Sequence, residues 1–325
     1  MSIMQKFRIA ILLILCTFCI YSQDYTYIDD KVKVYPNFSN INNLSIRIRN
    51  DFEKESERTR AAFIWVAHNI TYFKSLDDTF NSSPRFVHYS ESGRQYNINK
   101  YRTNRVKKAF KKREGICEDY SLILHELLVK MGLESKIIHG VSKTVITEIK
   151  KKPVLKNHSW NAVKIDEQWK LLDPTWASYY LKNISTKKYI KICYLTPPED
   201  FVKTHYPSQN HWQLLEKPID LDTFFSAPLF FPNYFDSQLK LSKNTKGTLS
   251  VSNTNQIFLK FDKIQSDIDA YYFIESKKQI RKIKFIKKNN GYVAKLKFNE
   301  TQDQYLTIWE KNGAILRFKI KRESS

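Results

Sequence analysis

The sequence of 325 residues predicts an α+β domain followed by a small all-β domain. Two stretches with apolar residues at three- and four-residue steps predict helices that begin at Asp51 and Cys117. Strand-like segments follow the second helix, and beyond residue 235 we count about eight short strands with alternating polarity. The length favours two domains. We place them at 23–235, with a core from about residue 50, and at 236–325.

The first 22 residues predict a removable signal peptide. Lys6 and Arg8 precede an almost wholly apolar run over 9–20, and the chain turns polar at Asp24. A run of about a dozen residues is too short to cross a bilayer comfortably. No second long apolar run follows, so we expect an exported protein that does not span a membrane and lies in the periplasm, at the cell surface or outside the cell.

The first helix is expected to start near Asp51 and to continue to about Tyr72. Before it, residues 24–50 are polar and Asn-rich, with short β-prone pieces. Acidic residues near the helix start suit the helix dipole. The apolar stripe of this helix consists of Ala62, Phe63, Trp65, Val66 and Ile70.

Between the two main helices, residues 74–104 predict a long surface loop or pair of loops, and 104–112 a basic helix. The helix from Cys117 ends at Gly132. Strands are expected over 133–142, 160–165 and 169–172, with a polar turn between the last two.

The C-terminal strands carry two strong hairpin signals, Asn290-Gly291 and Asn312-Gly313. Apolar and polar residues alternate cleanly along 292–298. Short strands of this kind predict a small β-sandwich, for which an immunoglobulin-like arrangement is the expected form.

The chain is strongly basic, with a net charge of +21, and loss of Lys6 and Arg8 changes this little. Such a charge favours anionic surroundings such as acidic glycans, wall polymers, membrane surfaces or nucleic acid. A Lys- and Asn-rich source would give the same composition, and the scattered charges favour that simpler reading. Anionic cell-surface polymers remain candidate partners. Nucleic acid is not expected, because no recognition motif is present and export argues against it.

Cys117 and Cys193 are the cysteines that remain after the signal peptide. An exported protein with two cysteines often joins them in a disulfide, which here would consume Cys117. Cys193 lies in a strand-like apolar run over 189–195, which suits a buried thiol. We therefore favour two free cysteines.

Cys117, His158 and Asp173 together predict nucleophilic chemistry. A thiol acts as a nucleophile only when ionised, and a helix N-terminus favours that charge. His158 begins a strand and supplies a base, while Asp173 would hold the second ring nitrogen. Glu118 and Asp119 oppose a thiolate, so the helix alone is not expected to suffice.

The strand spacing permits this triad without requiring it. If Asp166 pairs with Trp169, Ala162 lies opposite Asp173, and His158 is on the same face of the sheet. In that register His158 lies four residues further along, roughly 13 Å at about 3.3 Å per residue.

Two readings compete with the triad at these positions. A buried thiol, a hydrogen-bonded strand histidine and a turn aspartate would explain the three residues separately. A metal site of Cys117, His158 and Asp173 is disfavoured, since short CxxC or HxxxH spacings are absent after the signal peptide. The remaining histidines considered as ligands are scattered: His139, His205 and His211. No metal or other cofactor is expected.

Several motifs together resemble the transglutaminase-like superfamily, and the last of them resembles its branch that contains kyphoscoliosis peptidase. Coverage runs from about residue 50 to 235. The segments are Gly115–Tyr120, Asn157–Val163, Trp169–Trp176, Phe63–Tyr72, and Tyr194–Phe201 continuing to His205-Tyr206-Pro207 and Trp212–Leu215.

The resemblance implies a papain-like α+β fold in which Cys117 is the nucleophile, His158 the general base and Asp173 the residue that orients it. It implies attack on a peptide or amide carbonyl of a protein or peptide substrate, giving a thioester that water or an amine resolves. Cross-linking transglutaminases carry Gly-Gln-Cys-Trp, whereas this chain has Gly-Ile-Cys-Glu at 115–118. That departure favours hydrolysis over cross-linking. The alternatives are an amine-accepting cross-linker and a non-catalytic scaffold of the same fold.

The sequence also bears on the secretion route. Asn157-His158-Ser159 is a glycosylation sequon. A glycan on Asn157 would crowd the proposed base, so we expect a route without this modification and a bacterial source.

Overall fold

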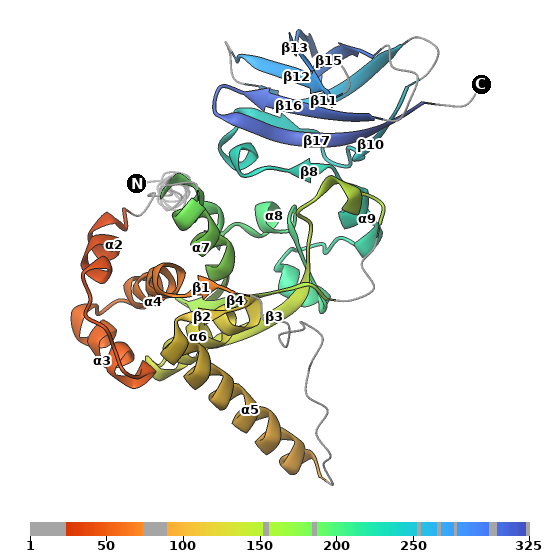
Figure 1. Ribbon diagram of the computed structural model, residues 1–325. Coiled ribbons are helices and arrows are strands. Elements are labelled where there is room, and N and C mark those ends of the chain that lie inside the picture. Colours follow the sequence, from red (N-terminus) through yellow and green to blue (C-terminus); the bar gives the residue numbers. More distant parts are fainter. Residues whose placement is uncertain are drawn as a thin grey trace, which may run out of the picture.

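A computed structural model describes the protein except for its N-terminal residues, its C-terminal end and several internal segments. The described residues are 24–73, 90–151, 156–183, 187–251, 255–264, 268–275, 278–298 and 304–322. The predicted signal peptide lies outside them. Every helix within them is too short or too polar to cross a bilayer. Figure 1 shows a helix-rich part with a five-stranded sheet, and a C-terminal part that is all β.

The segment before the first predicted helix is helical, so the β-prone reading of 24–50 is wrong. It forms α2 (Thr26–Lys33) and α3 (Ile41–Asp51). Each helix buries two apolar residues four positions apart against the core, namely Ile28 with Val32 and Leu44 with Ile48. Burial of these stripes outweighs the local preference for strand.

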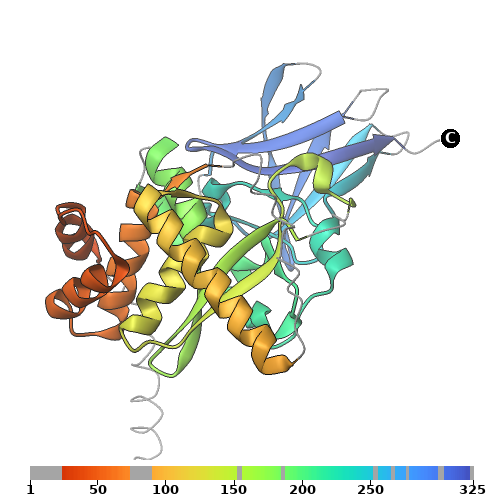
Figure 2. The same ribbon diagram turned by 60° about the horizontal axis from the view of Figure 1, so that its bottom comes forward.

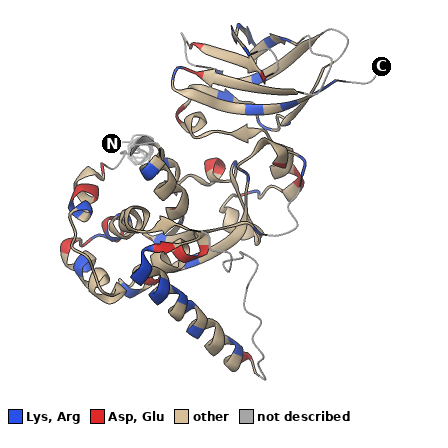
Figure 3. Cartoon of the chain, in the orientation of Figure 1, with Lys and Arg blue, Asp and Glu red and all other residues tan. Residues whose placement is uncertain are grey.

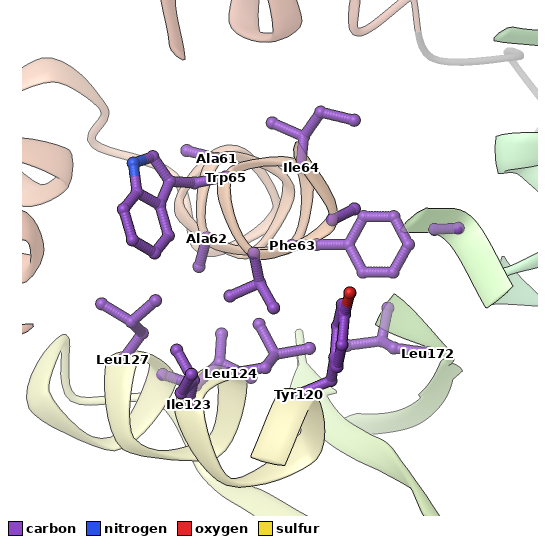
Figure 4. Packing of buried hydrophobic residues seen from close by; sticks show 14 of the residues in the cluster. Ala61, Ala62, Phe63, Ile64, Trp65, Tyr120, Ile123, Leu124, Leu127 and Leu172 are labelled. Carbon is purple, nitrogen blue, oxygen red and sulfur yellow. The ribbon is translucent and has the colours of Figure 1, made fainter. Parts of the chain in front are cut away.

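Both main helices are present, but the first begins at Glu55 instead of Asp51, which ends α3, and it ends at Asn69. The two helices are α4 (Glu55–Asn69) and α6 (Cys117–Lys130), and they pack across each other. In Figure 4, Ala62 and Phe63 of α4 lie over Leu124 and Tyr120 of α6. The central part of α4, residues 59–67, is buried on all sides. A helix enclosed in this way holds α6, and therefore Cys117, at a fixed depth in the molecule.

The expected loop over 74–104 is wrong for its described part. Helix α5 (Glu91–Lys112) occupies it, and the Ser90 hydroxyl accepts the Gly93 backbone N–H as its N-cap. The basic helix expected over 104–112 is the C-terminal end of α5. Its buried residues, Val106, Ala109 and Phe110, all belong to that end. The rest projects from the body in Figure 1 and crosses in front of it in Figure 2, and Lys and Arg lie along the helix (Figure 3).

The five-stranded sheet is antiparallel, in the order β6-β5-β4-β3-β7. Its strands are β3 (Ser135–Ser142), β4 (His158–Ile165), β5 (Gln168–Leu172), β6 (Tyr194–Thr196) and β7 (His205–Pro207). Asp166 and Glu167 both have positive φ and form a two-residue turn that pairs Ile165 with Gln168. The expected pairing of Asp166 with Trp169 is therefore wrong.

Short elements complete the helix-rich part. They are β1 (Thr71–Tyr72), β2 (Glu114–Gly115), η1 (Ile146–Glu148), α7 (Pro174–Asn183), η2 (Lys187–Ile192), α8 (Pro198–Phe201), η3 (Asn210–Gln213) and α9 (Leu221–Ser226). The run over 189–195 is thus a 3-10 helix followed by the start of β6, instead of one strand. Cys193 lies between the two.

The C-terminal part consists of two sheets that share one apolar core. The sheet orders are β10-β17-β16-β12-β13, with β8 on β17, and β14-β15-β11-β9. The elements are β8 (Leu229–Phe230), η4 (Pro232–Asp236), β9 (Leu239–Leu241), β10 (Thr248–Val251), β11 (Gln256–Ile264), β12 (Ala270–Ile274), β13 (Gln279–Lys282), β14 (Phe285–Lys288), β15 (Gly291–Lys297), β16 (Gln304–Glu310) and β17 (Gly313–Arg322).

Both predicted hairpins in this part are confirmed. Lys288 pairs with Gly291, and Glu310 pairs with Gly313, so each turn has two residues. Both glycines have φ near +120°, which a residue with a side chain rarely adopts. Ala294 and Leu296 are fully buried while their neighbours are not, as the alternating pattern predicts.

Candidate active site

Cys117 is the first residue of α6, as predicted. The Asp119 carboxylate accepts the Ile116 backbone N–H at 2.9 Å and so closes the start of the helix. The first N–H groups of a helix have no partner within it. The Cys117 thiol is only 2% exposed and therefore lies where this positive helix end acts with little screening by water.

Gly115 leaves room for the side chain that closes the start of α6. A Cβ at this position would lie 2.5 Å from Asp119 Cβ and 2.8 Å from Asp119 Oδ2. The glycine is needed because the carboxylate that closes α6 occupies that space.

His158 and Asp173 are in direct contact, with Nε2 of His158 2.7 Å from Oδ2 of Asp173. The remaining ring nitrogen, Nδ1, is left for Cys117. Burial alone would lower the pKa of His158, but the Asp173 carboxylate and a hydrogen bond with Cys117 outweigh it and raise that pKa. The pair is therefore an imidazolium beside a carboxylate at neutral pH.

The two-residue turn explains how this contact forms. Leu172 pairs with Asn161, so Asp173 follows one position beyond the ladder, opposite Trp160. His158 then lies two residues further along instead of the expected four. Two residues correspond to about 7 Å of strand, which two side chains can bridge.

Both carboxylate oxygens of Asp173 are hydrogen-bonded, Oδ2 to His158 and Oδ1 to backbone N–H groups. Oδ1 accepts the backbone N–H groups of Thr175 and Trp176, at 2.9 and 3.0 Å, at the start of α7. Its own N–H donates to the Cys193 carbonyl at 2.8 Å. The side chain is fully buried, which by itself would raise its pKa. The imidazoles of His158 and His205 outweigh burial and hold the pKa below its usual range.

The two acidic residues beside the nucleophile are both engaged. Arg105 forms a two-point contact with Asp119, at 2.5 and 3.0 Å, which offsets that charge. Glu118 Oε2 accepts the Ser159 hydroxyl at 2.8 Å and lies 3.3 Å from His139 Nδ1. The Ser159 oxygen is in turn 3.9 Å from the Cys117 sulfur. The expected repulsion of a thiolate by Asp119 is thus largely compensated.

Both cysteines are free, as favoured from the sequence, and both are buried. Burial, with a further contribution from Asp173, raises the pKa of the Cys193 thiol well above its ordinary value. Cys193 is therefore a poor nucleophile, and its part in the site is the backbone carbonyl that holds Asp173.

His205 belongs to the same cluster, and the sequence reading missed it. Its Nε2 is 3.1 Å from Asp173 Oδ2, and the residue is 2% exposed. In the sequence it is one of several scattered histidines. The available signal was its place in His205-Tyr206-Pro207, one of the segments that carry the family resemblance.

His158, Asp173 and His205 also form the one group within the described residues whose ligand atoms lie close enough together to hold a metal ion. This set differs from the metal alternative considered from the sequence, which used Cys117. Two hydrogen bonds to Asp173 Oδ2 account for the grouping. A metal ion there would have to displace both of them.

The comparison with protein families identifies the class of the helix-rich part. Residues 39–196 match the family model described as a transglutaminase-like domain, so the resemblance read from the motifs is confirmed. This segment contains Cys117, His158 and Asp173, whereas His205 lies beyond it.

Among curated proteins, the chain is similar to kyphoscoliosis peptidase of Mus musculus, with 25% identity over 190 residues, 57% of this chain and 26% of that protein. It is also similar to Hillarin of Drosophila melanogaster, with 29% identity over 133 residues, 36% of this chain and 16% of that protein. The chain thus matches only about a quarter of the length of kyphoscoliosis peptidase. Among solved structures, the periplasmic domain of TgpA from Pseudomonas aeruginosa aligns with 51% of this chain and 52% of that one, at 15% identity and a TM-score of 0.29.

Proposed function

We propose that the protein is a thiol enzyme that cleaves peptide or amide bonds with Cys117 as nucleophile, His158 as general base and acid, and Asp173 as the residue that orients His158. The observation that carries the proposal is the buried His158–Asp173 pair at 2.7 Å, beside a cysteine at a helix N-terminus. The match of residues 39–196 to the transglutaminase-like domain supports it.

In the proposed reaction the Cys117 thiolate attacks the carbonyl carbon of the substrate. The C–N bond breaks as the His158 imidazolium gives its proton to the leaving amine, which leaves a thioester on the sulfur. Water then attacks the thioester while His158 takes up its proton, and the carboxylic acid product is released. We propose the N–H groups in the first turn of α6 as donors to the carbonyl oxygen in the transition state.

We favour water over an amine as the acceptor because Glu118 replaces the tryptophan that follows the cysteine in cross-linking transglutaminases. An amine-accepting cross-linker is the second candidate. A non-catalytic scaffold is disfavoured, because a scaffold does not require a buried ion pair next to a thiol, an arrangement that is expensive to bury.

The wider setting is also a proposal. The apolar segment over 9–20 supports export by a bacterial route to the periplasm, the cell surface or beyond, and the net charge of +21 suits anionic polymers there. We propose a division near residue 235, because the core shared by the two C-terminal sheets has no member in common with the core of the helix-rich part. The short elements β8 and η4, just before and at this division, already pack with the C-terminal sheets. An immunoglobulin-like arrangement of these sheets is part of this proposal.

The test compares wild type with Cys117→Ala and, as the matched control, Cys193→Ala. Each protein is incubated with a peptide library, with and without a primary amine donor, and products are identified by mass spectrometry. We expect cleavage products from wild type and Cys193→Ala and none from Cys117→Ala. Amine-linked products would support the cross-linker instead. Equal products from all three proteins would rule out the mechanism.

A further inference from the structure

We propose that His205 is a positioning residue of this site, which holds the Asp173 carboxylate through a hydrogen bond from Nε2 and so keeps His158 aligned with Cys117. This inference rests on the proposed function of the triad. It assigns a role to a residue that lies outside the matched domain segment and 32 positions from Asp173 in the sequence.

The hydrogen bonds of the His205 ring define which nitrogen carries its proton. An ionised carboxylate only accepts hydrogen bonds, so Nε2, 3.1 Å from Asp173 Oδ2, must be the protonated nitrogen. Nδ1 then accepts, and its partner at 2.8 Å is the Thr204 hydroxyl. That hydroxyl is also 3.3 Å from the Phe201 carbonyl, the longer of its two contacts.

His205 carries one proton at neutral pH and no charge. Burial lowers its pKa to about 4, although Asp173 acts in the opposite direction. The neighbouring His158 imidazolium disfavours a second positive charge on the same carboxylate. His205 therefore acts as a neutral donor, and the ion pair belongs to His158 and Asp173 alone.

Aromatic side chains fix the plane of the His205 ring. Phe201 stacks on it with a centroid distance of 4.1 Å and an interplanar angle of 19°. The centroid of the Trp176 ring lies 4.4 Å from that of the His205 ring. The Trp160 ring meets the His205 ring edge-on, at a centroid distance of 5.1 Å. Trp176 is also the residue whose backbone N–H binds Asp173 Oδ1. Trp176 therefore contacts both the His205 ring, through its side chain, and the Asp173 carboxylate, through its backbone N–H.

The Asp173 carboxylate receives four donors in this arrangement. Oδ2 accepts from His158 and His205, and Oδ1 accepts the backbone N–H groups of Thr175 and Trp176. Because a carboxylate offers about four acceptor positions, none is left unsatisfied on the fully buried Asp173 side chain. Loss of His205 would leave Oδ2 with one donor, so the carboxylate could turn away from His158.

Two substitutions separate a positioning role from a packing role. His205→Phe keeps an aromatic ring for the stack on Phe201 but loses the donor. His205→Gln loses the aromatic ring but keeps an amide N–H that can reach Asp173. We expect His205→Phe to lower kcat about 10- to 100-fold with little change in KM, and His205→Gln to recover most of the loss. Loss of activity in His205→Gln with full activity in His205→Phe would overturn the proposal.

Cys117→Ala and His158→Ala are measured beside these variants, on a peptide that wild type cleaves. If both retain activity, the proposed function fails. If both are inactive and His205→Phe equals wild type, only the role of His205 fails. Should His205→Phe not fold, as judged by thermal unfolding, Thr204→Val serves in its place because it removes the donor to Nδ1. We expect a several-fold fall in kcat for Thr204→Val, and wild-type kcat would overturn the proposal.

Discussion

The helix-rich part and the C-terminal β part bury different kinds of side chain. In the helix-rich part the core includes charged and polar groups such as Arg60 with Asp29, Asp119, and the cluster around Asp173. Among the described residues of 236–322, the buried polar side chains are Ser237 and Thr307. A buried polar group must be hydrogen-bonded to be tolerated, and such satisfied groups fix geometry. The comparison indicates that the helix-rich part holds polar groups in fixed positions, whereas the buried side chains of the described β part are nearly all apolar.

The largest effect should come from changing the carboxylate at the centre of the polar cluster. Asp173→Asn keeps an Oδ1 acceptor for the backbone N–H groups of Thr175 and Trp176. Its amide NH₂ would face the N–H donors of His158 and His205, so the base would lose its orientation. We expect kcat/KM to fall about 10³- to 10⁴-fold, as for the corresponding change in serine proteases. Peptide cleavage measures this, with thermal unfolding as the control for folding, and activity within tenfold of wild type would contradict it.

In the β part, truncation of a core residue should affect stability and leave the site unchanged. Phe318 of β17 is fully buried, so Phe318→Ala should lower the free energy of unfolding by about 3–5 kcal/mol. Phe258→Ala is the matched control, because that ring is 56% exposed and its loss should change stability by less than about 0.5 kcal/mol. Urea unfolding measures both. A changed rate of Cys117 alkylation in folded Phe318→Ala protein would show that the two parts are coupled.

A smaller effect is expected from Lys143, a buried charge outside the triad. Its Nζ donates to the carbonyls of Phe224 and Ala227, at 2.8 and 2.9 Å. Burial lowers its pKa to about 7, against a small opposing effect of Glu148. The folded pKa lies below the unfolded value, so the unfolded chain binds more protons above pH 7. This group therefore makes stability rise with pH, by at most about 1.4 kcal/mol per unit.

Lys143→Met tests this by removing the titrating group. We expect the free energy of unfolding of wild type, measured between about pH 7 and 8, to rise more steeply with pH than that of Lys143→Met. The window stays below the usual pKa of cysteine and tyrosine, whose ionisation in the unfolded chain would act in the opposite direction. Parallel pH profiles for the two proteins would show that Lys143 is not titrating there.

Local patterns predicted the elements that depend on near neighbours in the sequence. The helices α4 and α6 follow from apolar residues at three- and four-residue steps. Both C-terminal hairpins follow from Asn-Gly dipeptides, whose glycine is the first residue after each turn. The helices over 24–50 were missed because their short apolar stripes are stabilised by packing against α4 and α6, which no local pattern reveals. The Asp166-Glu167 turn was misplaced by one residue because it lacks the glycine that usually marks a two-residue hairpin, and glutamate is not typical of positive φ.

The sequence by itself pointed to Cys117, His158 and Asp173 as candidate site residues and to a resemblance to the transglutaminase-like superfamily, because residue types and short motifs are local properties. Only the tertiary structure decided that His158 and Asp173 meet, since a change of one residue in the turn changes the distance between them along the sheet. It alone brought His205 to Asp173 and set the protonation of the cluster. Those features depend on burial and on contacts between distant segments, and both arise only when the chain packs.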